Sequence, residues 1–283
     1  MRVVFFNEAG TLRSGWKALA FFLVFSLLGA GTGFTFKLLG WGRGLGVWAS
    51  VAVGLATSAI CVRLEGRRLR DLGFSWGVPW LRDLALGALG GALLIALTAL
   101  VVRGAGGFHV GLTALLTPLW FWLGVAFNEE LITRGYPFQR LAEGAGTWVA
   151  QAVFATLFAL GHWGNPGMHG AAKAWATLNI SLAALLLGFA YLRTRSLALP
   201  IGIHLGWNWA QGSLLGFGVS GTTPTPGLFT PHLAAKPQWL TGGAFGLEAS
   251  LPCAVICALA VLGLGLWKGS ARVSGGASTA SGS

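Results

Sequence analysis

The sequence is short of charged side chains. Only 10% of its 283 residues are Asp, Glu, Lys or Arg, whereas a soluble protein usually carries about 25%. Hydrophobic residues make up 54% of the chain, and the mean hydropathy is +0.70. A soluble fold cannot bury that much apolar surface and still keep a polar exterior, but a lipid bilayer removes this conflict. The composition therefore predicts a polytopic integral membrane protein.

Cysteine is also scarce, with three residues that all lie within apolar runs: Cys61, Cys253 and Cys257. This pattern excludes a disulfide framework and a Cys-x-x-Cys metal knuckle. Small apolar packing residues are the role that such positions favour.

Three kinds of membrane protease chemistry lack their residues here. The chain has no His-Glu-x-x-His zinc motif. Its only aspartates, Asp71 and Asp83, fall in or beside a basic stretch over residues 63–83 and not within an apolar run, which excludes a pair of intramembrane aspartates. No apolar run carries a Gly-x-Ser site of the rhomboid kind.

The formal net charge is +11, but the lysines and arginines lie mainly in short segments between apolar runs. This placement indicates membrane topology and not nucleic-acid binding. If the N-terminus is inside and the spans alternate, 14 lysines and arginines lie inside and five outside, which accounts for all 19. The bias predicts a multi-pass protein of the cell inner membrane with both termini in the cytoplasm.

Eight apolar runs are long enough to be considered as membrane-spanning helices. The sequence thus predicts an all-α membrane protein, with a single transmembrane domain over residues 1–268 and a disordered Gly/Ser/Ala-rich tail over 269–283. Within the third run, Gly87-x-x-x-Gly91 resembles a helix-packing motif. The expected spans cover residues 17–37, 44–62, 84–102, 113–135, 147–162, 174–192, 196–215 and 250–267.

The fourth run carries ionisable residues where an apolar helix should avoid them. It contains Glu129, Glu130 and Arg134, and charges within a membrane segment are costly and usually functional. Glu130 and Arg134 are four residues apart, so they share a helix face and can pair. Glu129 points about 100° away at 3.6 residues per turn, which leaves its carboxylate free to act as a general base.

Two further runs supply polar groups that could meet this glutamate. The fifth run ends at His162, and an antiparallel hairpin that turns near residues 144–146 would set Glu129 and His162 at one level. The seventh run contains His204 and Asn208, which are four apart and face the same way. The three runs could therefore converge on one buried cavity.

In their order and spacing, these residues resemble the CPBP (Abi) family of CAAX proteases and bacteriocin-processing enzymes, which includes the type II CAAX prenyl endopeptidases. The family motifs Glu-Glu-x-x-x-Arg, Phe-x-x-x-His and His-x-x-x-Asn stand here as Glu129-Glu130…Arg134, Phe158…His162 and His204…Asn208. The resemblance covers the core motif region, residues 113–215. It implies an eight-helix fold with an active site buried between the fourth, fifth and seventh spans and reached from the cytoplasm.

The resemblance and the residue chemistry together imply an intramembrane endopeptidase. Glu129 would activate water with His162, while His204 and Asn208 would stabilise the oxyanion. The supporting residues would be Glu130 and Arg134, which pair and orient the carboxylates, and Phe158, which packs the His162 imidazole. The expected substrate is a peptide or a membrane-associated protein, lipidated or not, processed in the CAAX or bacteriocin manner.

Three alternatives stay open at this point. Family members are often described as metalloproteases, and Glu129, His162 and His204 could in principle be zinc ligands; a mechanism that requires no cofactor is favoured because no tight ligand spacing demands a metal. A proton-coupled transporter also uses buried Glu and His residues, although no inverted repeat is visible. A non-catalytic membrane scaffold is the third alternative, but no motif residue is lost.

Overall fold

The fold was analysed in a computed structural model, which describes residues 2–41, 46–102, 105–108, 112–224, 227–231, 233 and 236–269. Apart from Gly269, the predicted disordered tail lies outside the described residues. The described chain is dominated by helices, and its one sheet is a short antiparallel pair, β1 (Ala105–Phe108) and β2 (Phe229–Pro231).

The helices follow the apolar runs of the sequence. Four of them are long and apolar enough to cross a membrane, namely α2, α3, α4 and α8, while α7 and α11 are apolar but shorter. The class predicted from composition, a helical membrane protein, is thus confirmed. Each of the eight expected spans overlaps a helix, but the number of actual crossings stays a prediction. The helices are α1 (Arg2–Phe5), α2 (Ser14–Leu38), α3 (Val47–Leu64), α4 (Val78–Val102), α5 (Leu112–Thr133), α6 (Tyr136–Ala145), α7 (Thr147–Gly161), α8 (Gly170–Thr194), α9 (Ala198–Trp209), α10 (Gln238–Thr241) and α11 (Leu251–Leu266).

Short helical turns complete the connections between these helices. A π-helical turn, Ala210–Leu214, continues α9, and 3-10 turns lie at Leu69–Leu72, Gly243–Phe245 and Leu247–Ala249. The last of these turns leads directly into α11, whose first turn is capped by the Ser250 side chain accepting from the backbone N–H of Cys253.

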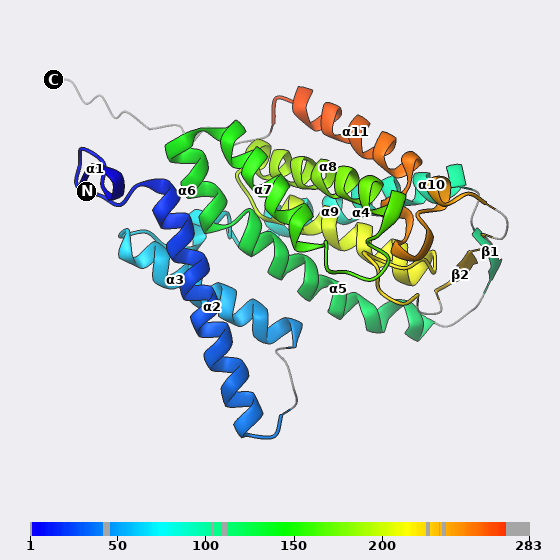
Figure 1. The fold of residues 1–283 in the computed structure, drawn as a ribbon, viewed down its shortest axis with the longest axis horizontal. Coiled ribbons are helices and arrows are strands. Elements are labelled where there is room, and N and C mark those ends of the chain that lie inside the picture. The colour runs from blue at the N-terminus through cyan, green and yellow to red at the C-terminus, as the bar shows by residue number, and fades with distance from the viewer. Residues whose placement is uncertain are drawn as a thin grey trace.

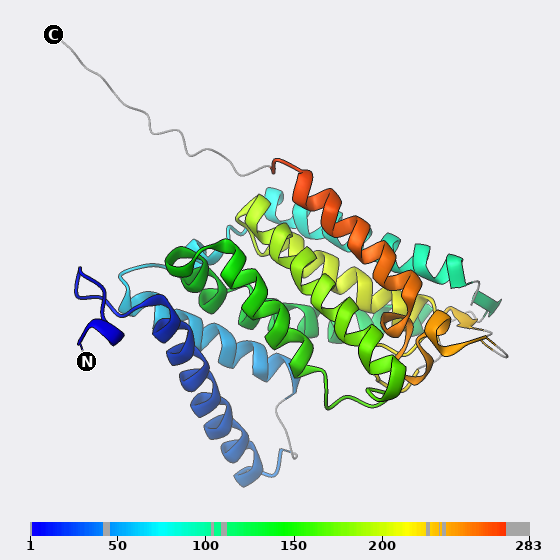
Figure 2. The same ribbon diagram turned by 45° about the horizontal axis from the view of Figure 1, so that its top comes forward.

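Figures 1 and 2 show a bundle in which α4, α8, α9 and α11 lie alongside one another, with α5 and α7 beside them. Helix α2 packs against α3 and α6 and then diverges from the bundle. The strands β1 and β2 lie at one end of the molecule. Helix α1 lies at the opposite end, and α11 runs from the side of the strands back along the bundle.

Helices α4 and α9 approach closely because glycines line both surfaces. A Cβ atom added at Gly91 would lie 2.0 Å from the Ile203 carbonyl oxygen, and one added at Gly206 would lie 1.9 Å from the Ala88 oxygen. The packing motif predicted at Gly87-x-x-x-Gly91 therefore meets a second one, Gly202-x-x-x-Gly206. This contact sets the position of α9, which carries His204 and Asn208.

The fourth expected span does not run straight into a hairpin with the fifth. Helix α5 ends at Thr133, Gly135 forms the break, and α6 begins with Tyr136-Pro137. A side chain at Gly135 would collide with the Leu131 carbonyl oxygen at 2.1 Å, and Pro137 lacks the N–H that a continuous helix would need. The hairpin is consequently formed by α6 and α7, so the register argument that paired Glu129 with His162 rested on the wrong helix pair.

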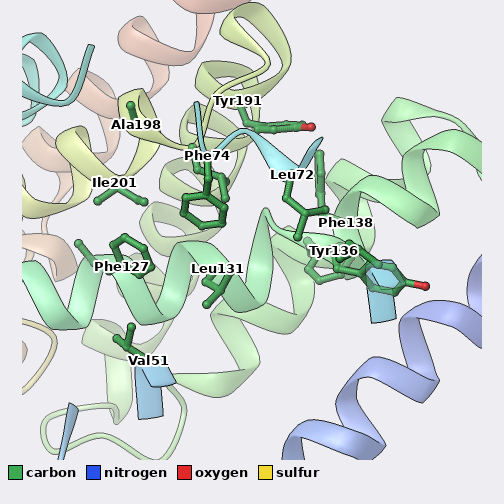
Figure 3. Close-up of a cluster of buried hydrophobic side chains, with 14 of the residues drawn as sticks. Val51, Leu72, Phe74, Phe127, Leu131, Tyr136, Phe138, Tyr191, Ala198 and Ile201 are labelled. Atoms are coloured by element: carbon green, nitrogen blue, oxygen red, sulfur yellow. The ribbon is translucent and has the colours of Figure 1, made fainter. Parts of the chain in front are cut away.

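A buried hydrophobic cluster fixes the broken end of α5. Phe127 and Leu131 from α5 pack with Phe138 from α6 and Ile201 from α9 (Figure 3). The basic stretch over residues 63–83 contributes Phe74, whose ring stacks on Phe127 at a centroid distance of 5.6 Å. This loop thus turns its aromatic side chains partly inward and holds the helix that carries the two adjacent glutamates.

Candidate active site

A cavity of about 200 Å³ lies among α5, α7, α8 and α9, and the chain after α9 and before α11 adds further residues to its wall. Five of the residues predicted from sequence line it, namely Glu129, Phe158, His162, His204 and Asn208. The other two, Glu130 and Arg134, lie behind this wall. The remaining lining residues are Phe121, Trp122, Val125, Asn165, Asn179, Ile180, Ala183, Leu186, Leu187, Ile203, Trp207, Val219, Ser220, Thr222 and Glu248.

Glu130 is completely buried and joins two cationic or polar partners. Its Oε1 atom lies 3.1 Å from Nη1 of Arg134 and 2.9 Å from Nδ1 of His204. The Glu130–Arg134 pair expected from their spacing is therefore present. Glu130 also contacts His204, which lies in the seventh expected span. The other carboxylate oxygen of Glu130, Oε2, is buried without a hydrogen-bond partner. Because a buried carboxylate needs partners that compensate for its lost hydration, the contacts of Oε1 with Arg134 and His204 hold the Glu130 side chain in place.

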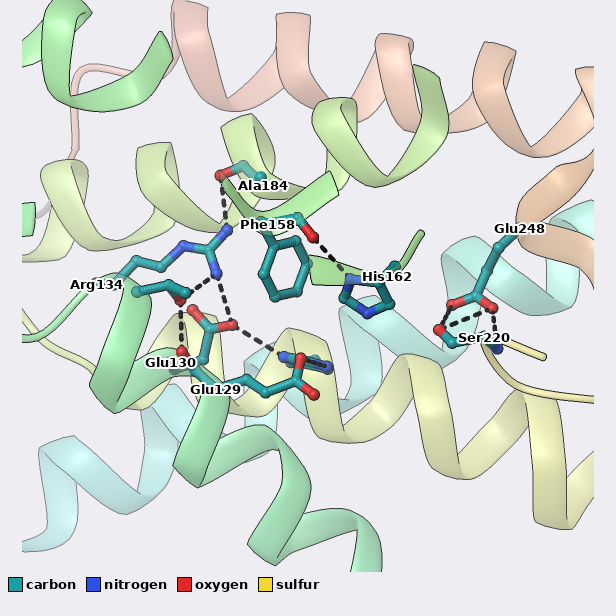
Figure 4. Close-up of polar contacts among 10 residues, drawn as sticks. Glu129, Glu130, Arg134, Phe158, His162, Ala184, Ser220 and Glu248 are labelled. Atoms are coloured by element: carbon teal, nitrogen blue, oxygen red, sulfur yellow. Dashed lines mark hydrogen bonds and ion pairs between the residues drawn. The ribbon is translucent and has the colours of Figure 1, made fainter. Parts of the chain in front are cut away.

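Arg134 is fixed on three sides, and 1% of its side chain is exposed. Besides the ion pair with Glu130, its Nη2 donates to the carbonyl oxygen of Ala184 in α8 at 3.0 Å. Its guanidinium lies over the Phe158 ring, 4.9 Å from the centroid. The arginine thus ties α5 to α7 and α8 and keeps the Glu130 carboxylate aimed at His204 (Figure 4).

Glu129, by contrast, is partly open to the cavity. About a third of its side chain is exposed (31%), against none for Glu130. Its Oε2 atom lies 3.7 Å from Nε2 of His204, beyond hydrogen-bonding distance. The 100° separation of the two adjacent glutamates therefore sends one side chain into the ion-pair network and the other into the cavity.

His162 follows the last residue of α7, and its ring orientation is set by its own helix. The Nδ1 atom lies 2.7 Å from the carbonyl oxygen of Phe158. Because a carbonyl only accepts, Nδ1 donates this hydrogen bond, and Nε2 is the ring nitrogen left for another partner. The neighbouring Phe158 ring packs edge-on against the imidazole at 4.8 Å, so this histidine is oriented by two contacts.

His204 is held in the same way by a different acceptor. Its Nδ1 donates to the Glu130 carboxylate, so Nε2 is the nitrogen that faces Glu129. Phe158 also meets this ring edge-on, at 6.3 Å. Phe158 therefore separates Arg134 from the cavity and packs against both histidines. Asn208 lies one helical turn further along α9 and lines the same cavity.

The proposed zinc ligands do not form a metal-binding group in this structure. Over the ranges described, no three His, Cys, Asp or Glu side chains are placed together as a metal ion would need. His204 directs Nδ1 to Glu130, and its Nε2 and the Glu129 carboxylate are 3.7 Å apart.

Sequence reasoning missed the polar residues at the other end of the cavity. Glu248 lies in the turn before α11, and Ser220 lies in the chain after α9. The Glu248 carboxylate accepts from the Ser220 backbone N–H at 2.5 Å, from the Ser220 hydroxyl at 3.1 Å and from Nε2 of Gln211 at 3.2 Å. Burial raises the pKa of Glu248, while the Ser220 and Gln211 hydrogen bonds and the nearby His162 oppose that rise.

A signal for Glu248 was present in the sequence. It is the last of only eight acidic residues, and it lies two residues before the apolar run over residues 250–267. The contribution of α8 could not be recognised in this way, because Asn179 is an ordinary polar residue in a membrane helix.

Comparison with known protein families agrees with the motif residues. Residues 111–210 match the family model described as type II CAAX prenyl endopeptidase, Rce1-like. All seven predicted site residues lie within that range, whereas Glu248 lies outside it. No curated protein sequence matches the chain significantly. The family match confirms the resemblance to the CPBP family and supports an endopeptidase.

Proposed function

We propose that this chain, whose residues 111–210 match the type II CAAX prenyl endopeptidase family, hydrolyses a peptide bond with water activated by Glu129 and His162. The supporting observation is that the two adjacent glutamates have different surroundings. Glu130 is completely buried in contact with Arg134 and His204, while the Glu129 carboxylate reaches the cavity that His162 also lines.

The first step of the proposed reaction is the attack of water. A water molecule between the Glu129 carboxylate and Nε2 of His162 would lose a proton to Glu129 as its oxygen bonds to the carbonyl carbon of the substrate. His162 is suited to orient that water, because Nδ1 is committed to the Phe158 carbonyl and Nε2 is left to accept a hydrogen bond.

The second step is collapse of the tetrahedral intermediate. The Asn208 amide and His204 would donate hydrogen bonds to the oxyanion. His204 would donate from Nε2, which must then carry a proton. Glu130 supports that protonated form, since its carboxylate holds the opposite nitrogen of the ring at 2.9 Å. The proton held by Glu129 then passes to the amide nitrogen as the C–N bond breaks, which returns Glu129 to its carboxylate form.

The substrate class follows from the walls of the cavity and from the membrane helices around it. Most lining residues are apolar, among them Leu186, Leu187 and Trp207, and such a site favours a peptide with apolar residues or an attached lipid. We infer that the substrate is a membrane-associated protein or peptide. The distribution of Lys and Arg further supports insertion in the inner membrane with both termini in the cytoplasm.

The experiment that tests this function is peptide cleavage by the purified protein in detergent. The pool includes a farnesylated CAAX peptide, and products are identified by mass spectrometry. Glu129→Ala and His162→Ala are compared with the wild type, and Glu143→Ala is the matched control, since that glutamate is half-exposed on α6 and pairs with Arg67 and Arg140.

We expect cleavage by the wild type and the control, and none by the two site variants. Addition of a zinc chelator separates the two forms of the mechanism: unchanged cleavage supports the metal-free reaction, and its loss supports the zinc-dependent one. Cleavage that survives Glu129→Ala would refute the proposed mechanism.

A further inference from the structure

The cavity has a second acidic residue that the family motifs do not include. In Figure 4, Glu248 lies beyond His162, on the side away from Glu129 and Glu130, and its carboxylate faces the imidazole. Both Glu248 and His162 line the cavity. The carboxylates of Glu129 and Glu248 therefore stand on opposite sides of His162.

Three hydrogen-bond donors hold the carboxyl group of Glu248 in place. Only 6% of the residue is exposed, and the Ser220 N–H, the Ser220 hydroxyl and Nε2 of Gln211 donate to its oxygens. A set of donors of this kind stabilises the ionised form, which can only accept. The Ser220 carbonyl in turn accepts from Nδ2 of Asn165 at 2.8 Å, so the surrounding chain is fixed as well.

An unsatisfied acceptor adjoins this end of the cavity. The Asn179 side chain lines the cavity from α8, the residue is 1% exposed, and its Oδ1 atom has no hydrogen-bond partner. A buried polar atom without a partner costs about 1–3 kcal/mol. A bound group that donates hydrogen bonds would remove that cost.

The charge of the lining points to the sign of such a group. Among the described residues that line the cavity there are two glutamates and two histidines but no lysine or arginine. Arg134 lies behind the wall and is paired with Glu130. Two carboxylates that face one cavity attract a cation, and this attraction is screened less inside a cavity than at an open surface.

We propose that Glu248 and Asn179 form a substrate subsite that binds a basic side chain, lysine or arginine, close to the scissile peptide bond. This inference rests on the proposed endopeptidase function and adds a substrate preference to it. A lysine or arginine side chain fits because its apolar stem can lie along the Leu186 and Leu187 wall while its charged end donates to Glu248 and to Asn179 Oδ1.

The test measures the preference of the enzyme for a charged residue in the peptide. If Glu248 had a purely structural role, Glu248→Gln would leave that preference unchanged. Peptides acetylated at the N-terminus, so that they carry no free amine, are derived from one cleaved sequence. Each position within four residues of the cleavage site carries in turn Lys, Arg, Gln or Glu. The ratio of kcat/KM for the Lys peptide to that for the Gln peptide is determined for the wild type, Glu248→Gln, Asn179→Leu and the control Glu143→Gln.

The wild type and the control should prefer Lys over Gln at one position by about tenfold or more, which corresponds to about 1.4 kcal/mol. Glu248→Gln should bring that ratio close to one, and Asn179→Leu should reduce it. A wild type with no preference at any position, or a preference that Glu248→Gln retains, would overturn the inference. In either case cleavage that depends on Glu129 would leave the proposed function standing.

A binding measurement covers the case in which a variant is poorly folded or turnover is too slow. Fluorescently labelled Lys and Gln peptides are titrated into Glu129→Gln protein in detergent, and their dissociation constants are compared by anisotropy. Tighter binding of the Lys peptide by about tenfold supports the subsite. Equal affinity of the two peptides contradicts it, whatever the rate of cleavage.

Discussion

Nδ1 of His204 lies 2.9 Å from Oε1 of Glu130, and the same oxygen lies 3.1 Å from Nη1 of Arg134. One carboxylate oxygen thus joins α5 to α9 and completes an ion pair that Arg134 extends to the Ala184 carbonyl in α8. Because all these atoms are buried, removal of the carboxylate would leave an arginine charge without its partner.

Glu130→Ala is therefore expected to destabilise the fold, whereas Glu129→Ala is expected to affect mainly the reaction. Breaking a buried ion pair from one side costs about 3–5 kcal/mol. Within the described part of the chain, the Glu129 carboxylate has no ion pair of comparable length, and Nε2 of His204 lies 3.7 Å from it. Thermal unfolding of the two variants in the same detergent checks this difference, and equal losses of stability would contradict it.

The close contact between α4 and α9 predicts a contrast between two adjacent glycines. Gly91→Val should strongly reduce both folded yield and activity, because its Cβ would overlap the Ile203 carbonyl and push α9 away with His204. Gly90→Val should be tolerated, since a Cβ added there would meet no atom within 4 Å apart from its chain neighbours and its own helix backbone. Monodispersity in detergent and the rate of peptide cleavage measure the two effects; similar damage from both substitutions would show that the packing is not the cause.

A polar network between α2, α3 and α6 predicts that stability depends on pH. Glu65 lies at the end of α3, and its carboxylate contacts Lys17 at 2.8 Å, Arg140 at 3.0 Å and the Tyr136 hydroxyl at 3.0 Å. Burial alone would raise the pKa of Glu65, but Lys17, Arg140 and Tyr136 outweigh it and hold the pKa below its ordinary value of 4.5.

Because the folded pKa of Glu65 is lowered, the network stabilises the folded state above the ordinary pKa. That contribution is lost as the pH falls through the folded value. The melting temperature of the wild type should thus decline more steeply below pH 4.5 than that of Glu65→Gln, which lacks the titrating group. Parallel declines in the two proteins would mean that other carboxylates control acid stability.

The sequence predicted the helices well because apolar runs in a membrane protein have few other stable structures. It also identified Glu129, His162 and His204 as residues that should converge, and the three line one cavity. It could not show how the helices pair, since hydropathy does not record which faces meet. The paired glycine motifs of α4 and α9 became interpretable only once Gly91 and Gly206 were seen to face the partner helix.

Two features of the site could not be placed in space from the sequence, for definite reasons. At Gly135, where α5 gives way to α6, a side chain would collide with the Leu131 carbonyl oxygen, and hydropathy alone does not record such a steric limit. Glu248 joins the cavity through a long connection after α9, and no spacing rule relates it to His162. Both positions required the three-dimensional arrangement.

The most direct test of the central claim is the initial rate at which one cleaved peptide is hydrolysed by the wild type, Glu129→Gln and Glu143→Gln. The Gln side chain keeps the shape of Glu129 but cannot take a proton from water. We expect Glu129→Gln to cleave about 10²–10⁴-fold more slowly and Glu143→Gln to cleave at the wild-type rate. A Glu129→Gln rate within a few-fold of the wild type would contradict the account, because the water would then be activated by another group.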